Sequence, residues 1–264
     1  MKKIMTIIAA AAVALTLVGC ANFGDAKASG TKYKKTFSLD ATGELKDADG
    51  NAATYSRAFS ALSTSKKCSA IETTITLPKG EDNVFISDKD NPNTHKKYQA
   101  VVGLAFDVHL TKNDAGEDVY DFVLVGVKPG DGGYYIEKYT GVKKDDLKES
   151  MKTNEGSIGG TYTPVQGAAE TNGWAGTLTL PTDGDTTWKI SVTQETAGTY
   201  KVLINDVVKG TYTRELTDAE KADTKNGKAY GQIFLYANAP TGTKIKGTFE
   251  SNKDKTVGLF ADEE

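Results

Sequence analysis

Cysteine and histidine are scarce in this chain of 264 residues, and their scarcity excludes several kinds of chemistry. The two histidines are His95, in the polar turn "NPNTHKKY", and His109, which has no serine elbow or cysteine to activate. The motifs of zinc proteases and of phosphate-binding loops are also missing. The sequence therefore contains none of the common signatures of nucleophilic catalysis or metal-assisted hydrolysis.

An excess of basic residues is also lacking, as is an apolar run long enough to span a bilayer. The 32 Lys and Arg against 35 Asp and Glu give a formal net charge of −3, so the charge does not favour a nucleic-acid partner. The apolar run Ile4–Val18 is too short for a spanning helix, which needs about 20 apolar residues. Because Lys2 and Lys3 precede it, the run has the layout of a secretory signal peptide.

The apolar run ends in Leu17-Val18-Gly19-Cys20, which resembles the lipobox of bacterial lipoproteins. The resemblance implies that residues 1–19 are a lipoprotein signal peptide, that cleavage precedes Cys20, and that Cys20 carries the lipid anchor. Alanine rather than aspartate follows Cys20, which in this family implies delivery to the outer membrane of the bacterial cell envelope. The alternative is a soluble secreted protein whose cysteine stands there by chance.

Residues 20–31, "CANFGDAKASGT", are small and polar and are predicted to form a flexible tether after the lipidated cysteine. Cys68 is then the one thiol left in the mature chain, so no internal disulfide can form. It is either a small buried side chain or, if exposed, a thiol whose pKa the neighbouring Lys66 and Lys67 depress.

Alternation of apolar and polar residues predicts β-strands along most of the remaining chain, with a turn of positive φ at Gly116 and a tight turn at Asn205-Asp206. The predicted strands are 70–77, 101–110, 118–128, 174–180, 186–194, 198–205, 207–213, 230–238, 242–249 and 256–260. Only 143–152 and 215–224 have a helical pattern, and both are predicted to be short helices in loops. Many short strands with few helices indicate an all-β, two-sheet sandwich or barrel, and residues 32–264 show no linker that would divide them into domains.

The segment "TTWKISVTQETAGTYKVLINDVVKGTY", followed by "YGQIFLYANAPTGTKIKGTF", resembles the C-terminal half of a laminin-G or concanavalin-A-like jelly roll. The runs "AVVGLAFDVHL", "DVYDFVLVGVK" and "GGYYIEKY" are similar to the middle strands of that family. The resemblance covers roughly residues 54–250 and implies an antiparallel jelly-roll sandwich. Its I-N-G turn is Ile204-Asn205-Asp206 here, so the best motif is imperfect.

Jelly rolls of this kind serve as glycosidases, lectins or adhesion modules, so function depends on the site. The acid spacing of related glucanases is missing, and the nearest polar pair is Asp107 with His109. Alternation places this pair on one face of its strand with Gly103 and Ala105, either as a sugar-binding concavity or as a solvated sheet face.

Aromatic residues at loop edges are the other ligand-binding candidates, because sugars stack on exposed Trp and Tyr rings. Trp174 lies at a loop-to-strand junction, and Tyr134 with Tyr135 follows "GDGG". Trp188, by contrast, shares a face with Ile190 and Val192 and is predicted to be core.

A bound metal is not expected. Calcium, which lectin-like jelly rolls often bind, could use "KDADGNAAT" or "PTDGDTTW", but Ala52 occupies the position where an EF-hand requires glycine. Both stretches are explained as Asp-Gly turns between strands.

These observations predict a lipid-anchored, extracytoplasmic binding protein that presents a lectin-like sandwich to a glycan or to another surface protein. A divergent carbohydrate-active enzyme such as a glycoside hydrolase, or a structural envelope lipoprotein without a small ligand, is the alternative.

Overall fold

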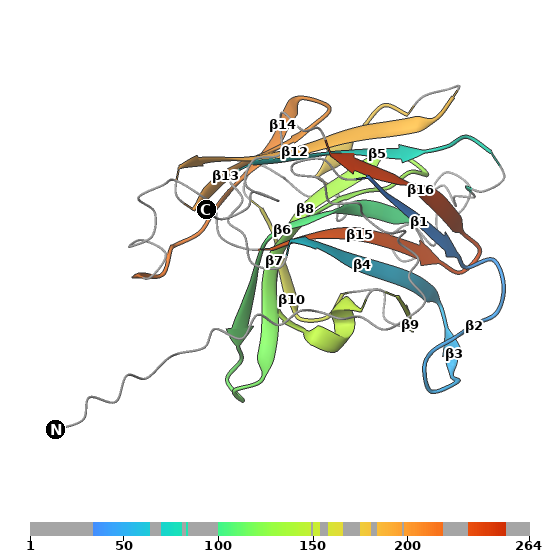
Figure 1. Cartoon of the computed structure of the whole chain (residues 1–264), viewed down its shortest axis with the longest axis horizontal. Coiled ribbons are helices and arrows are strands. Elements are labelled where there is room, and N and C mark those ends of the chain that lie inside the picture. Colours follow the sequence, from blue (N-terminus) through green and yellow to red (C-terminus); the bar gives the residue numbers. More distant parts are fainter. Residues whose placement is uncertain are drawn as a thin grey trace.

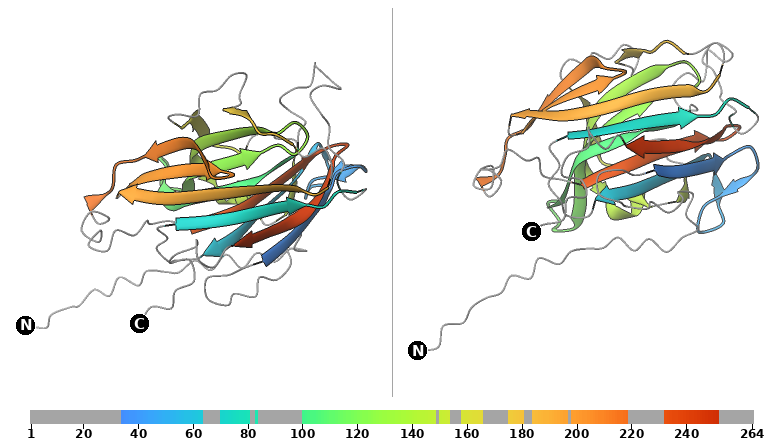
Figure 2. Two further views of the ribbon diagram at one scale, coloured as in Figure 1. Left: turned by 90° about the horizontal axis from the view of Figure 1, so that it is seen from above. Right: turned by 45° about the horizontal axis from the view of Figure 1, so that its top comes forward.

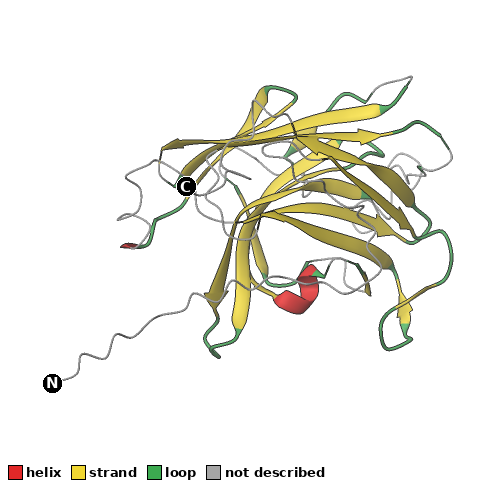
Figure 3. Cartoon of the chain, in the orientation of Figure 1, coloured by secondary structure: helices red, strands yellow, loops and turns green. Residues whose placement is uncertain are grey.

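The structure is a computed structural model, and it describes residues 34–63, 70–80, 83, 100–148, 150–153, 158–165, 175–180, 184–196, 198–218 and 232–251. These residues form two antiparallel sheets that pack face to face as two layers (Figures 1 and 2). Strands make up most of the described chain; the helical residues are one turn of 3₁₀ helix, η1 (Lys144–Leu147), and Asp218, the last described residue after β14 (Figure 3). The predicted all-β, antiparallel two-sheet sandwich is confirmed.

The smaller layer has six strands, and its order across the sheet mixes distant parts of the chain. In that order its strands are β1 (Lys34–Asp40), β16 (Lys244–Ser251), β5 (Ala70–Leu77), β12 (Thr186–Thr196), β13 (Thr199–Ile204) and β14 (Val207–Thr213). Only β12, β13 and β14 are joined by hairpins, so the sheet depends on pairings between segments far apart in sequence.

The larger layer begins with an edge strand and ends with a short one. Across the sheet its strands are β10 (Thr161–Pro164), β8 (Gly133–Lys143), β7 (Asp118–Val127), β6 (Val101–Lys112), β15 (Gln232–Pro240), β4 (Tyr55–Ser63) and β9 (Met151–Thr153), while β11 (Gly176–Thr177) also pairs with β8. A small separate ribbon joins β2 (Leu45–Lys46) to β3 (Ala52–Ala53).

The core between the sheets arises from the period-two alternation of the strands, which turns every second side chain inward. Trp188 and Ile190 of β12 lie there, fully buried, together with Phe37 and Phe249, whose ring centroids are 4.9 Å apart. The prediction that Trp188 belongs to the core is confirmed.

The local turns follow the predicted chemistry. Gly116, in the β6–β7 hairpin, has φ 77°, and Asn205 and Asp206, between β13 and β14, have φ 51° and 64°. Two successive positive values are the signature of the two-residue turn whose twist matches a hairpin. In the predicted helical stretch 143–152, only the single turn η1 forms and β9 begins at Met151. Most of 215–224 and all of 256–260 lie outside the described residues.

The larger sheet is buried on both faces, and this feature positions the candidate site. Its outer face, away from the smaller sheet, carries a second cluster of buried side chains (the outer-face cluster). The members are Phe59, Val101, Ala105, Val108, Tyr120, Phe122, Leu124, Tyr135, Tyr139, Val142, Leu147, Ile158, Phe234 and Tyr236. Leu147 belongs to η1, which lies on this side of the larger sheet (Figure 1). In the described part of the chain, no helix is long and apolar enough to cross a membrane.

Candidate functional site

Asp107 occupies a bulge in the middle of β6. The pairing of β6 with β7 shifts register between Phe106 and His109, and the Asp107 backbone has φ 51°. A bulge adds one residue, so alternation no longer decides which face the side chain takes. Asp107 therefore turns toward the smaller sheet, and the prediction that it shares a face with Gly103 and Ala105 is wrong.

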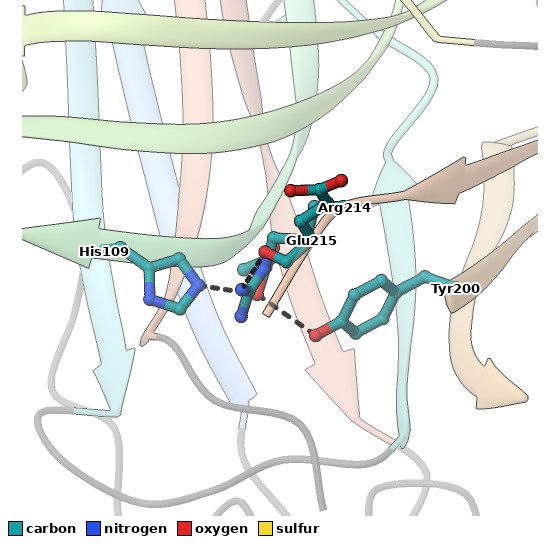
Figure 4. A network of polar contacts seen from close by, with 5 residues as sticks. His109, Tyr200, Arg214 and Glu215 are labelled. Atoms are coloured by element: carbon teal, nitrogen blue, oxygen red, sulfur yellow. Dashed lines mark hydrogen bonds and ion pairs between the residues drawn. The ribbon is translucent and has the colours of Figure 1, made fainter. Parts of the chain in front are cut away.

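Three side chains donate hydrogen bonds to the buried Asp107 carboxylate (Figure 4). His109 Nε2 is 2.7 Å from Oδ1, the Tyr200 hydroxyl is 3.1 Å from Oδ1, and Arg214 Nε is 2.7 Å from Oδ2. The bond to the carboxylate assigns the Nε2–H tautomer to His109. Tyr200 lies on β13 and Arg214 directly follows β14, so the carboxylate ties the larger sheet to the smaller one.

The Asp107 carboxylate is more deeply buried than the His109 and Arg214 side chains that bind it. The exposed fraction of the side chain is 25% for His109, 13% for Arg214 and 1% for Asp107. Such a carboxylate needs a compensating charge, which the Arg214 guanidinium supplies. Burial, and then the Asp107 charge, raise the pKa of Tyr200, which remains a neutral hydroxyl donor. The arrangement is a satisfied polar network between the sheets.

Tyr134 and Tyr135 lie within β8 rather than at an exposed loop edge. Both are 7% exposed, so the prediction that they present open rings is wrong. Alternation sends them to opposite faces: Tyr134 enters the inter-sheet core with Lys209 Nζ 5.2 Å from its ring centroid, and Tyr135 enters the outer-face cluster. The strand begins at Gly133, directly after the glycine-rich turn.

An aromatic row crosses the outer face at the β10 edge. Tyr162 of β10 pairs with Tyr139 of β8, and their ring centroids are 5.8 Å apart. Tyr139 in turn stacks on Phe122 of β7, with centroids 5.2 Å apart and ring planes 15° from parallel. Tyr162 is 52% exposed, whereas the other two rings are buried. The row therefore runs from solvent into the sheet.

A polar group accompanies this row. The Tyr139 hydroxyl donates a 2.7 Å hydrogen bond to Glu137 Oε2, two residues earlier on the same face of β8. Burial, with the adjacent Glu137 charge, raises the pKa of Tyr139 well above its ordinary value. The hydroxyl is therefore a permanent donor that fixes the Glu137 carboxylate next to the aromatic rings.

Further polar side chains lie deeper in the outer-face cluster. Tyr236 of β15 lies in register with Gly103 of β6, which pairs with Gly126 of β7, which pairs with Tyr135. A Cβ on Gly126 would lie 2.2 Å from Tyr135 Cζ, so only glycine lets the tyrosine ring lie across β7. The Arg57 guanidinium of β4 lies near Tyr236 and partly offsets the rise that burial causes in the tyrosine's pKa. Burial raises the pKa of both Tyr135 and Tyr236, which leaves two neutral hydroxyls beside a buried cation.

Asn238 of β15 completes this deeper group. It pairs directly with Arg57 across the β15–β4 ladder and lies two residues beyond Tyr236, on the same face. The residue is 4% exposed, and its Oδ1 has no hydrogen-bond partner in the structure. A buried acceptor without a donor costs about 1–3 kcal/mol.

The other residues singled out in the sequence have different outcomes. Trp174, Cys20, Cys68 and His95 lie outside the described residues. Tyr162, Tyr139, Glu137, Arg57 and Asn238 were not selected from the sequence. Alternation within "YYIEKY" groups Tyr135, Glu137 and Tyr139 on one face, and this was the signal that could have found the β8 members.

No group of three His, Cys, Asp or Glu side chains that could hold a metal ion occurs among the residues with described placement. In the β2–β3 turn, Asp47 Oδ1 accepts the backbone N–H groups of Asp49 and Asn51 at 3.0 and 2.8 Å. These bonds use the carboxylate to close the turn, and they lower the pKa of Asp47.

No protein-family model matches the sequence, and no curated protein matches it. Among solved structures, the chain is similar to a protein of unknown function with a galectin-like fold from Bacillus subtilis, at 9% identity over 84% of this chain and 82% of that one, with a TM-score of 0.37. It is also similar to an alginate lyase in complex with an alginate tetrasaccharide, at 7% identity over 84% and 81%, with a TM-score of 0.36. Lectin II from Ulex europaeus follows at 11% identity over 86% and 85%, with a TM-score of 0.21. These values say nothing about a ligand or a reaction.

Proposed function

We propose that this protein is a lipid-anchored, glycan-binding β-sandwich whose ligand face is the outer face of the larger sheet at the β8–β10 edge. The observation that carries the proposal is the exposed ring of Tyr162, 52% exposed and held against Tyr139. Sugars bind aromatic side chains through their apolar C–H faces, and the ring must have one open side. Tyr162 is the one exposed aromatic side chain among the residues of described burial.

The ring of Tyr162 is preorganised by the residues behind it. Tyr139 is fixed by stacking on Phe122 and by its hydrogen bond to Glu137, so the surface offered by Tyr162 rests on a rigid support. Rigidity lowers the conformational entropy lost on binding. Glu137, 8% exposed, places a carboxylate acceptor beside the stack for a sugar hydroxyl.

The polar content of the outer face favours binding over hydrolysis. A glycoside hydrolase needs two carboxyl groups on either side of the scissile bond, about 5–9.5 Å apart. Within the outer-face cluster, the described side-chain hydrogen bond to a carboxylate is the one that Glu137 accepts from Tyr139. The Asp107 carboxylate faces the other way, toward Tyr200 and Arg214.

The attachment of this sandwich to a membrane is proposed from the sequence. The lipobox Leu17-Val18-Gly19-Cys20 and the polar residues after it support an acylated Cys20 followed by a tether. Two or more acyl chains are needed for stable anchoring, and lipoproteins of this kind carry them at the cysteine. The proposed place is the outer membrane of a bacterial envelope, with membrane lipid and a glycan as partners and no nucleic acid.

The experiment is a glycan-array screen of the purified protein, followed by titration of the best ligand against wild type and Tyr162→Ala. Loss of the stacking surface should weaken binding by about 1–3 kcal/mol, which is roughly 5- to 150-fold in Kd. Val207→Ala is the matched control, because Val207 is 55% exposed but lies on β14 of the smaller sheet. The proposal fails if no glycan binds, or if both variants bind like wild type.

A further inference from the structure

The polar side chains buried beside the outer-face cluster carry balanced charges, and this balance favours one class of ligand. They combine one cation, Arg57, with one carboxylate, Glu137, and both influence the hydroxyls of Tyr135 and Tyr236. All four residues are buried to at least nine-tenths. A ligand that entered with a charge of its own would leave an uncompensated charge in this buried group, at a large desolvation cost.

Asn238 adds a hydrogen-bond acceptor without a donor to these residues, in which the charges of Arg57 and Glu137 balance. Its Oδ1 is buried and without a hydrogen-bond partner, and its pairing with Arg57 places it beside the polar side chains. The neighbouring tyrosines retain their protons because burial raises their pKa values, so they offer donors and weak acceptors but no charge. Arg57 Nε–H, in the paired position on β4, also has no acceptor in the structure, so the missing element is a neutral group that both donates and accepts a hydrogen bond. A sugar hydroxyl has this chemistry, and it can also accept a bond from a tyrosine.

We propose that Asn238, Arg57, Tyr236 and Tyr135 form a subsite for the hydroxyl-bearing edge of an uncharged sugar residue, with Asn238 Oδ1 accepting one of its hydroxyls. This inference rests on the proposed glycan binding and specifies the class of glycan that binds. Tyr162 lies exposed on the edge strand β10, whereas the subsite residues lie on β8, β15 and β4 of the same face and are buried. A ligand therefore reaches Asn238 only by displacing side chains that cover it, which lowers the association rate relative to an open site.

The test uses two variants that remove the acceptor, Asn238→Leu and Asn238→Ala, with Ser56→Ala as control. Ser56 neighbours Arg57 on β4, is 5% exposed and faces the other side of the sheet by alternation. Asn238→Leu keeps the branched shape and the number of side-chain heavy atoms, although its methyl groups are larger, and it removes an unpaired buried acceptor, so thermal unfolding should change little. Both Asn238 variants should bind the best neutral glycan about tenfold more weakly or worse, whereas Ser56→Ala should bind like wild type.

The glycan array provides a second test, of the preference for uncharged sugars, because it carries neutral glycans alongside glycans that contain uronic acid or sulfate. Neutral glycans should give the signal. Preferential binding of anionic glycans that still depends on Tyr162 would overturn the subsite and leave the proposed function standing, as would wild-type affinity in both folded Asn238 variants. If no glycan binds to wild type, the proposed function and the subsite fall together.

Discussion

Replacing Asp107 by alanine should loosen the connection between the two sheets. The substitution removes a carboxylate whose side chain is 1% exposed and which accepts hydrogen bonds from His109, Tyr200 and Arg214. Truncating one partner of a buried ion pair costs about 3–5 kcal/mol, because the other charge stays buried without compensation. Arg214 is 13% exposed and can recover part of its hydration, so we expect about 3 kcal/mol.

Backbone conformation adds a second cost, and a control is needed to separate it. Asp107 has φ 51°, a region that aspartate tolerates better than alanine. Asp206 provides the match, since it has φ 64° and its carboxylate bonds to Lys189 Nζ at 2.6 Å, but its side chain is 72% exposed. The two variants share the backbone penalty and differ in burial.

The assay is urea unfolding of Asp107→Ala, Asp206→Ala and wild type at neutral pH. In a parallel thermal unfolding experiment, a loss of about 3 kcal/mol corresponds to a decrease in Tm of roughly 6–12 °C for a chain of this size. Asp206→Ala should lose far less, since an exposed ion pair contributes little. Equal losses in the two variants would refute the reasoning, because burial and the three donors would then add nothing to the stability.

Three further predictions concern the anchor, the core and alkaline pH. Cys20→Ser should abolish lipid attachment and move the protein out of the detergent-rich phase in a partition assay; a variant that stays membrane-bound and is processed normally would contradict the lipobox. Trp188→Ala should destabilise the protein by about 3–5 kcal/mol in the same urea assay, because this core side chain is 1% exposed; a loss below 1 kcal/mol would show that the site is not tightly packed. The free energy of unfolding should fall as pH rises above 10, the ordinary tyrosine pKa. Above this pH the unfolded chain releases tyrosine protons, whereas the folded chain retains them on tyrosines whose pKa values are raised by burial. Each such tyrosine should lower the free energy of unfolding by about 1.4 kcal/mol per pH unit. These tyrosines are Tyr135, Tyr139, Tyr200 and Tyr236. A urea midpoint that stays constant from pH 9 to 11 would count against their burial.

Much of the sandwich follows from local pattern, because a strand reveals itself by alternation over a few residues. The run 70–77 is β5 residue for residue, and 118–128 differs from β7 by one position. The positive φ of Gly116 follows from its turn sequence in the same way. Strand positions and turn conformations depend on local sequence and could therefore be predicted from it.

The candidate site was harder to predict because it depends on effects that alternation does not contain. The bulge at Asp107 changes the face of one side chain, and no residue type in "LAFDVHL" signals it. The strand sequence around Tyr135 does not show that the outer face of the larger sheet is buried, so the tyrosine was expected to be exposed. Asn238 and Arg57 become neighbours only through the pairing of β15 with β4, two strands that lie near opposite ends of the domain's sequence.

The most direct test of the central claim is a backbone-amide NMR map of the protein with and without the best ligand from the array. The account predicts that the largest chemical-shift changes fall on the outer face of the larger sheet, on β10, β8 and β7 around Tyr162, and on β15 and β4 where the subsite is occupied. Changes confined to β13 and β14 of the smaller sheet, or to the Asp107 network, would place the ligand elsewhere and contradict it.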